Sequence, residues 1–262
     1  MQTFASVDID ILGNRYMKKN ILNNKAELAD LVAARIEEVI NNKPDALICL
    51  CAGESPILIV KKLVEDAKAG LYPSDKFKFI SLDEWVGLGI DDAGSCIHDL
   101  TKLFLKPIGI EEGERLCFFN GLSDNLDGEC VKADEFINNN GGIDVVLLGI
   151  GMNGHVGFNE PGSKKTDSVR VINLSEISKA VSKKYFDRPQ KPEKGITLGL
   201  KEIMGAKKIL LIASGAHKQD IVQETVCGEM SESCPSSLLQ EHKDIELFLD
   251  VDAAEKIQNK II

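Results

Sequence analysis

An apolar run that ends in a glycine-rich turn, in the middle of the chain, constrains the fold more than any other feature. Residues 143–148 (IDVVLL) have the composition of a buried strand. They lead directly into residues 149–157, which contain several glycines and His155. Open α/β sheets place ligands at such turns, where glycine lets the backbone approach closely and histidine moves protons near neutral pH. The run predicts an α/β fold with a functional site at this strand end.

The same turn matches the G-x-G-x-x-G pattern of dinucleotide-binding folds through Gly149, Gly151 and Gly154. That pattern needs a long helix that opens at its last glycine. Gly157 and Pro161 would break such a helix almost at once. We therefore expect no nicotinamide or flavin site here.

Strand and helix patterns alternate along the chain, which is typical of a mainly parallel sheet covered by helices on both faces. We expect one Rossmann-like α/β domain over residues 1–262. The predicted strands are 46–51, 77–82, 116–119, 143–148, 208–213 and 245–250, and the predicted helices are 25–40, 56–69, 96–105, 131–138 and 218–226.

Residues 162–194 form the least regular part, with many Lys and Ser residues and with Pro189 and Pro192. Composition favours a solvated surface excursion over a functional element. Because this segment directly follows the histidine turn, a mobile helical lid is the functional alternative.

The net charge of −10 excludes some functions, because general nucleic-acid or anionic-membrane binding needs a basic surface. No apolar run approaches the ~20 residues of a membrane helix, and the N-terminus lacks a signal-peptide pattern. The seven cysteines include no CxxC pair, so we expect buried thiols in a reducing compartment and no zinc or other metal site. These features predict a cytoplasmic protein.

The loop Gly53-Glu54-Ser55-Pro56 joins a predicted strand to a predicted helix. Ser55 suits the N-cap and Pro56 the first helical position. Backbone N–H groups and the positive end of the helix dipole would then point at one place, which suits a phosphate group. A capped helix without a ligand is an equally good alternative. Glu54 fits beside a dianion only if it points away or meets a cationic part of the ligand.

Two adjacent carboxylates, Asp83 and Glu84, follow the predicted strand 77–82. A carboxylate at a strand end can be desolvated and act as a proton-transfer base. Neighbouring strand residues face opposite ways, so we expect only one of the two to enter the site. A surface acidic pair that caps the next turn is the simpler interpretation.

Glu160 lies five residues after His155, and a carboxylate that holds an imidazole fixes its tautomer and raises its basicity. Lys218, after the strand 208–213, could reach a phosphate. The phosphate loop, the carboxylate, the histidine and the lysine each follow a different strand. A parallel sheet brings those strand ends to one edge.

Several collinear segments resemble the glucosamine-6-phosphate deaminase family. They match its Gly-Gly-Thr-Pro phosphate loop, its Met-Asp-Glu-Tyr-Val-Gly-Leu segment, its Gly-His-Ile-Ala-Phe-Asn-Glu-Pro signature, its Gly-Ser-x-Lys turn and its late Ser-x-Leu-Gln-x-His segment. In this sequence they are residues 53–56, 82–88, 154–161, 214–218 and 237–242.

The resemblance implies a sugar phosphate isomerase-like fold and a cofactor-free reaction that converts a 2-amino-2-deoxyhexose 6-phosphate to a ketohexose 6-phosphate and ammonia. It implies that His155, supported by Glu160, opens the sugar ring, and that Asp83 moves a proton between C2 and C1. Gly53, Glu54 and Ser55 with Lys218 and Lys184 would bind the sugar phosphate. Lys184 stands in a Lys183-Lys184-Tyr185-Phe186 run where the family has Ser-Arg-Phe-Phe, and a lysine lacks the bidentate fork of arginine. Relatives are often oligomeric, so a homo-oligomer is one expectation.

Asn153 is the main departure, because the family has an aspartate two residues before the histidine. An asparagine can orient the ring but cannot stabilise imidazolium by charge. One hypothesis is a deaminase with altered specificity, which favours galactosamine 6-phosphate over glucosamine 6-phosphate; Glu54 fits that change. The other is impaired ring opening in a non-catalytic sugar-phosphate sensor, which the retained Asp83, His155 and Glu160 disfavour.

A 6-phosphogluconolactonase-like hydrolase is the neighbouring enzyme alternative, with a related fold and a Gly-His loop. Lactone hydrolysis has no need of a base at Asp83, and the two long segments match the deaminases better. A sensor would need an added DNA-binding or interaction segment, whereas the predicted fold accounts for all 262 residues.

Overall fold

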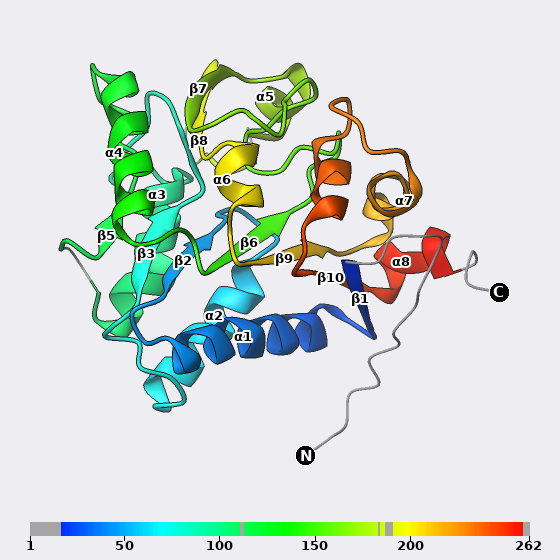
Figure 1. Ribbon diagram of the computed structural model, residues 1–262, viewed down its shortest axis with the longest axis horizontal. Coiled ribbons are helices and arrows are strands. Elements are labelled where there is room, and N and C mark those ends of the chain that lie inside the picture. Colours follow the sequence, from blue (N-terminus) through cyan, green and yellow to red (C-terminus); the bar gives the residue numbers. More distant parts are fainter. Residues whose placement is uncertain (1–16, 111–112, 183, 187–190, 259–262) are drawn as a thin grey trace.

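The centre of the structure is a seven-stranded sheet with the order β1-β10-β9-β6-β2-β3-β5 (Figure 1). The computed structural model describes residues 17–110, 113–182, 184–186 and 191–258. All neighbouring strands in this sheet are parallel, which confirms the predicted fold class. The strands are β1 (Met17–Leu22), β2 (Leu47–Leu50), β3 (Lys78–Ser81), β5 (Leu116–Cys117), β6 (Val145–Gly149), β9 (Lys208–Ala213) and β10 (Ile245–Asp250).

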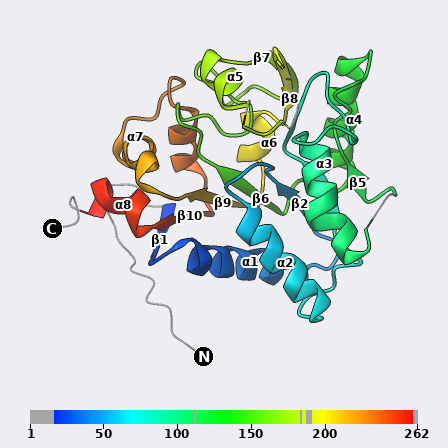
Figure 2. The ribbon, with the colours of Figure 1, turned by 180° about the vertical axis from the view of Figure 1, so that it is seen from behind.

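Helices cover both faces of the sheet, as predicted. Figures 1 and 2 show α1 (Lys25–Asn42) and α2 (Ile57–Lys68) on one face and α6 (Leu200–Met204) and α7 (Gln219–Cys227) on the other. The central strands β2 and β9 are therefore buried on both sides, which explains why they are continuous apolar runs. The other helices are α3 (Cys96–Leu100), α4 (Leu126–Asn139), α5 (Glu176–Ser182) and α8 (Val251–Gln258).

Two helix predictions need correction. Pro56, not Ser55, is the N-cap of α2, and no side chain caps it; the shift of one residue leaves the dipole pointing into the same loop. The predicted helix 96–105 is α3 followed by a π-helical turn, η1 (Thr101–Leu105), and a 3-10 turn, η2 (Lys106–Ile108). Two further 3-10 segments are η3 (Ala216–Lys218) and η4 (Pro235–Glu241).

A second, three-stranded antiparallel sheet was not predicted. It consists of β4 (Asp83–Trp85), β8 (Lys194–Thr197) and β7 (Arg170–Asn173), in that order. β7 and α5 give part of residues 162–194 regular structure, which the composition did not indicate; residues 183 and 187–190 of that segment, with Pro189, lie outside the described residues. Sequence patterns also missed β1, α6 and α8.

The direction in which successive strands are added to the sheet reverses between β2 and β6, which are parallel, hydrogen-bonded neighbours. From β2 the chain continues to β3 on one side, whereas β6 is followed by β9 on the other side. Loops that leave such a pair of strands diverge and open a crevice at their carboxyl ends. The loop after β2 and the histidine turn after β6 therefore face the same crevice.

Buried thiols fill part of the core. Cys49 and Cys51, on and after β2, are 0% and 7% exposed, and all seven cysteines are free thiols.

Within the described part of the chain, no helix has both the length and the apolar character required to cross a membrane.

Candidate functional site

A cavity lies at the carboxyl edge of the large sheet. The loops after β2, β6 and β9 contribute Gly53, His155 and Lys218 to its wall, and β4, which directly follows β3, contributes Asp83. The structure therefore brings together residues from all four strand ends that the sequence singled out.

The loop after β2 forms one wall. Gly53 has a φ of 92°, a left-handed conformation that favours glycine. Glu54 and Ser55 are exposed at the rim and line the cavity. The α2 helix starts at Ile57, so its free N–H groups and the positive end of its dipole are directed at this loop. This wall is suited to bind an anionic group.

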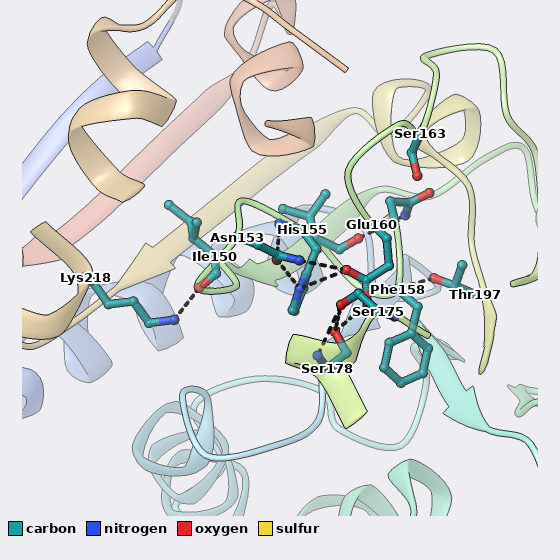
Figure 3. A network of polar contacts seen from close by, with 12 residues as sticks. Ile150, Asn153, His155, Phe158, Glu160, Ser163, Ser175, Ser178, Thr197 and Lys218 are labelled. Atoms are coloured by element: carbon teal, nitrogen blue, oxygen red, sulfur yellow. Dashed lines mark hydrogen bonds and ion pairs between the residues drawn. The ribbon is translucent and has the colours of Figure 1, made fainter. Parts of the chain in front are cut away.

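His155, Asn153 and Glu160 form one hydrogen-bonded unit (Figure 3). Asn153 Nδ2 donates to Glu160 Oε2 at 2.9 Å, and Asn153 Oδ1 lies 2.6 Å from His155 Nδ1. An ionised carboxylate only accepts hydrogen bonds, so the amide nitrogen of Asn153 must face Glu160 and its oxygen must face the imidazole. The proton of neutral His155 is therefore on Nδ1, and Nε2 is the basic nitrogen.

Burial, with a smaller contribution from the charge of Lys218, keeps His155 neutral. Burial lowers the pKa of His155 below its ordinary value, the Glu160 carboxylate acts in the opposite direction, and Lys218 adds to the lowering. Glu160 Oε2 is 3.6 Å from His155 Nδ1, and the imidazole side chain is 23% exposed. A neutral, partly exposed imidazole can accept a proton near neutral pH.

Glu160 is itself held by Ser178 of α5 and by Ser175, the residue that precedes this helix. The Ser178 hydroxyl and the Ser175 backbone N–H both donate to Oε1, the latter at 3.3 Å. Burial raises the pKa of Glu160, but the Ser178 hydroxyl, the positive charge that His155 carries when it is protonated and the Asn153 amide outweigh burial, so the pKa is lowered overall. The carboxylate therefore stays ionised beside the imidazole.

The side chains of Asp83 and Glu84 point in different directions, as the alternation of side chains along a strand predicted. Asp83 lines the cavity, and burial raises its pKa to about 7 although a hydrogen bond from Cys96 lowers it. Glu84 points to α3, where its carboxylate accepts the backbone N–H groups of Cys96 and Ile97 at 2.9 and 2.8 Å. The pair is buried rather than on the surface, and Glu84 caps the next helix. A carboxylate with a pKa near neutrality is suited to transfer protons.

Lys218 reaches the cavity from η3, after β9. Its ammonium donates to the Ile150 carbonyl at 2.6 Å, beside the histidine turn. Burial lowers the pKa of Lys218, and the charge of Lys184 lowers it further. Lys184 is exposed and does not line the cavity, so the structure does not place this predicted phosphate ligand at the wall.

Sequence patterns missed the aromatic wall of the cavity. Trp85 packs on Phe158 with ring centroids 4.6 Å apart, and Tyr185 lies 6.4 Å from Trp85. All three residues line the cavity. Each lies within a segment that the sequence analysis singled out (residues 82–88, 154–161 and 183–186), but only tertiary packing brings the three segments together.

Comparison with known proteins identifies the family. A family model described as glucosamine-6-phosphate isomerases/6-phosphogluconolactonase matches residues 23–248. The chain belongs to this enzyme family. Its members include the glucosamine-6-phosphate deaminase of Thermoanaerobacter sp. (strain X514), which is 35% identical over 245 residues that cover 93% of this chain and 96% of that protein. The deaminase of Clostridium perfringens (strain 13 / Type A) is 34% identical over 243 residues, or 92% of this chain and all of that protein.

Solved structures in the glucosamine-6-phosphate isomerase/6-phosphogluconolactonase family share the fold. A monomeric glucosamine-6-phosphate deaminase, described as a missing link of the NagB superfamily, has a TM-score of 0.87 and 30% identity, and the match covers 92% of this chain and 99% of that one. The 6-phosphogluconolactonase of Trypanosoma cruzi has a TM-score of 0.75 at 18% identity, with 94% and 98% covered. At that identity the likeness concerns the fold alone.

Proposed function

We propose that this enzyme converts a 2-amino-2-deoxyhexose 6-phosphate and water to a ketohexose 6-phosphate and ammonia. The observation that carries the proposal is the buried Asp83, whose pKa is raised to about 7, in the same cavity as His155. The relatives at 34–35% identity are named glucosamine-6-phosphate deaminases, which supports the same reaction class.

The proposed reaction begins with ring opening. His155 Nε2 takes the proton of the anomeric hydroxyl and delivers it to the ring oxygen as the C1–O5 bond breaks, which gives the open-chain aldose. Glu160, through Asn153, holds the imidazole in the tautomer that this step needs. Because Asn153 is uncharged, the stabilisation of imidazolium falls to Glu160 Oε2, 3.6 Å from Nδ1.

Proton transfer and deamination follow. Asp83 removes the proton from C2 while the C1 oxygen takes a proton from the substrate ammonium group, which gives an enolamine. Asp83 then returns its proton to C1, so the sugar becomes a 2-iminium ion. Water adds to the iminium carbon, its two protons pass to nitrogen, and nitrogen leaves as ammonium when the C2 carbonyl forms. Gly53, Ser55 and the N-terminus of α2, with Lys218, bind the phosphate, because they supply N–H donors and a cation at one wall. Lys184 joins them only if its exposed side chain reorients toward the cavity.

Within this class we propose galactosamine 6-phosphate as the preferred substrate and glucosamine 6-phosphate as the second. Two departures from the deaminase pattern support this order: Asn153 in the catalytic unit and Glu54 at the cavity rim. The names of the relatives favour the glucosamine compound. The ratio of the two rates measures the preference.

The test uses the purified wild-type enzyme with both sugar phosphates, and ammonia release is measured side by side. Release from either sugar supports the reaction class, and a faster rate on galactosamine 6-phosphate supports the specificity. Hydrolysis of 6-phosphogluconolactone without ammonia release from either amino sugar would replace the proposal with the lactonase alternative. Binding of the sugar phosphates without turnover would indicate a sensor.

A further inference from the structure

The Cys96 thiol contacts the carboxylate that we propose as the base. Cys96 Sγ donates to Asp83 Oδ1 at 3.4 Å, and the two residues are only 6% and 9% exposed. Burial, followed by the charges of Glu84 and Asp83, raises the pKa of this thiol well above its ordinary value. The thiol is therefore protonated when Asp83 is ionised, so the thiol must be the donor and the carboxylate the acceptor.

The neighbouring Glu84 fixes the position of this thiol. Glu84 accepts the backbone N–H of Cys96 at 2.9 Å and that of Ile97 at 2.8 Å. It also accepts the N–H of Trp85, in its own strand, at 2.8 Å. The N-terminus of α3 is thereby tied to β4, with the Cys96 side chain directed at Asp83. The two adjacent carboxylates thus have different roles: Glu84 holds the helix whose residue Cys96 donates a hydrogen bond to Asp83.

We propose that Cys96 is a positioning residue for Asp83, because its hydrogen bond to Oδ1 holds the carboxylate in one orientation for proton transfer. The inference rests on the proposed role of Asp83 as the base. A hydrogen bond to one carboxylate oxygen restrains rotation about the Cβ–Cγ bond, so the other oxygen keeps a constant direction. Donation to the ionised form also favours that form, in opposition to burial.

Other titratable groups face Asp83, and their effects on its pKa can be distinguished from the effect of Cys96. Cys49 and Cys51 approach from β2, and Tyr185 approaches from the segment after α5; burial raises the pKa of each. All three stay protonated near neutral pH and do not change charge there. Burial raises the pKa of Glu84 to about 7, so Glu84 is the neighbour whose titration overlaps that of Asp83. Its contacts are unchanged when only the Cys96 side chain is replaced.

The test compares Cys96→Ala with wild type by two readouts, the pH dependence of kcat and the titration of Asp83 followed by carboxyl ¹³C NMR. Asp83→Asn identifies the Asp83 signal by its loss. Removal of a hydrogen bond of this kind should raise the pKa of Asp83 by about half to one pH unit and move the acidic limb of kcat with it. Cys117→Ala, which removes a buried thiol on β5, should leave both readouts unchanged.

Two negative results have different meanings. If Asp83→Asn is inactive but Cys96→Ala titrates like wild type, the positioning role of Cys96 is wrong and the base assignment stands. If Asp83→Asn keeps wild-type activity, the proposed base is wrong. Should Cys96→Ala fail to fold, Cys96→Val fills the space of the thiol but has no donor, so the pKa of Asp83 in this variant must lie above that of wild type. An unchanged pKa of Asp83 in Cys96→Val would equally overturn the proposal.

Discussion

Asn153 donates from Nδ2 to Glu160 Oε2 at 2.9 Å, and this contact determines which way the amide faces. With the amide nitrogen committed to the carboxylate, Oδ1 is left for His155 Nδ1 at 2.6 Å. An uncharged residue thus fixes the tautomer of the imidazole as an aspartate would, but it contributes no charge.

Asn153→Asp should raise the pKa of His155, because a carboxylate would replace the amide oxygen next to Nδ1. An opposite charge at this distance raises the pKa by about 1–3 units. The new carboxylate would also face Glu160, so the two acids would share a proton in the acidic range. NMR titration of the His155 ring measures the effect. An unchanged pKa, with unchanged preference between the two amino sugars, would show that Asn153 sets neither property.

Asp83→Asn should stabilise the protein increasingly as the pH rises. The carboxyl has a pKa of about 7 when folded and about 3.9 when unfolded, so folding is penalised as the pH rises between these values, and the penalty is complete above about pH 7. The variant lacks the penalty, which is on the order of 4 kcal/mol at about pH 8 and small at about pH 4.

Urea unfolding of wild type and Asp83→Asn at both pH values tests this relationship. Asp45→Asn, at an exposed turn, controls for the change in net charge. A stability difference between Asp83→Asn and wild type that does not vary with pH would mean that Asp83 is not held with a raised pKa.

Gly151→Ala should displace the catalytic imidazole. A Cβ at Gly151 would lie 2.3 Å from His155 Nε2 and 2.4 Å from Cδ2 and Cε1, closer than atoms can approach. A displacement of about 1 Å at a reacting group can lower kcat about 10²-fold. Gly149→Ala is the comparison, since its Cβ would make only an ordinary contact with Ser55 at 3.7 Å. Equal kcat values for the two variants would contradict the close approach.

Ser178→Ala should loosen Glu160 by removal of the hydroxyl that donates to Oε1. The loss of one such hydrogen bond, worth about 0.5–1.5 kcal/mol, should lower kcat about 2- to 12-fold. Ser182→Ala is a matched control, because this buried serine is on the same helix but donates to the Lys179 carbonyl at 2.8 Å. A similar loss in both variants would point to helix stability rather than to support of Glu160.

Local sequence patterns predicted the large sheet well where strands are long and buried on both faces. The observed bounds of β9 and β10 equal the predicted ones, since continuous apolar runs carry the signal. The small sheet had no such signal. Its strand β4 has three residues and pairs with β8, far away in sequence, through Asp83↔Thr197. Partners that are distant in sequence determine such strands.

The candidate site was predictable in part because its residues follow strands whose positions the sequence indicated. Parallel strands bring their carboxyl ends together, so Gly53, Asp83, His155 and Lys218 line one cavity. The hydrogen bonds from Ser178 to Glu160 and from Cys96 to Asp83 depend on how α5 and α3 pack, which periodicity does not encode. Lys184 was assigned by resemblance, and the structure leaves it exposed.

Turnover by Asp83→Asn in D₂O tests whether Asp83 transfers the proton. Wild-type enzyme should release ammonia from galactosamine 6-phosphate or glucosamine 6-phosphate and form a ketohexose 6-phosphate whose C1 carries deuterium to the extent that the Asp83 proton exchanges with solvent before it returns. The variant should still bind the sugar phosphate in isothermal titration, but ammonia release should fall about 10²- to 10⁴-fold. Ammonia release by Asp83→Asn within about threefold of the wild-type rate, a difference below ~1 kcal/mol in the barrier, would contradict the assignment of Asp83 as the residue that transfers the proton.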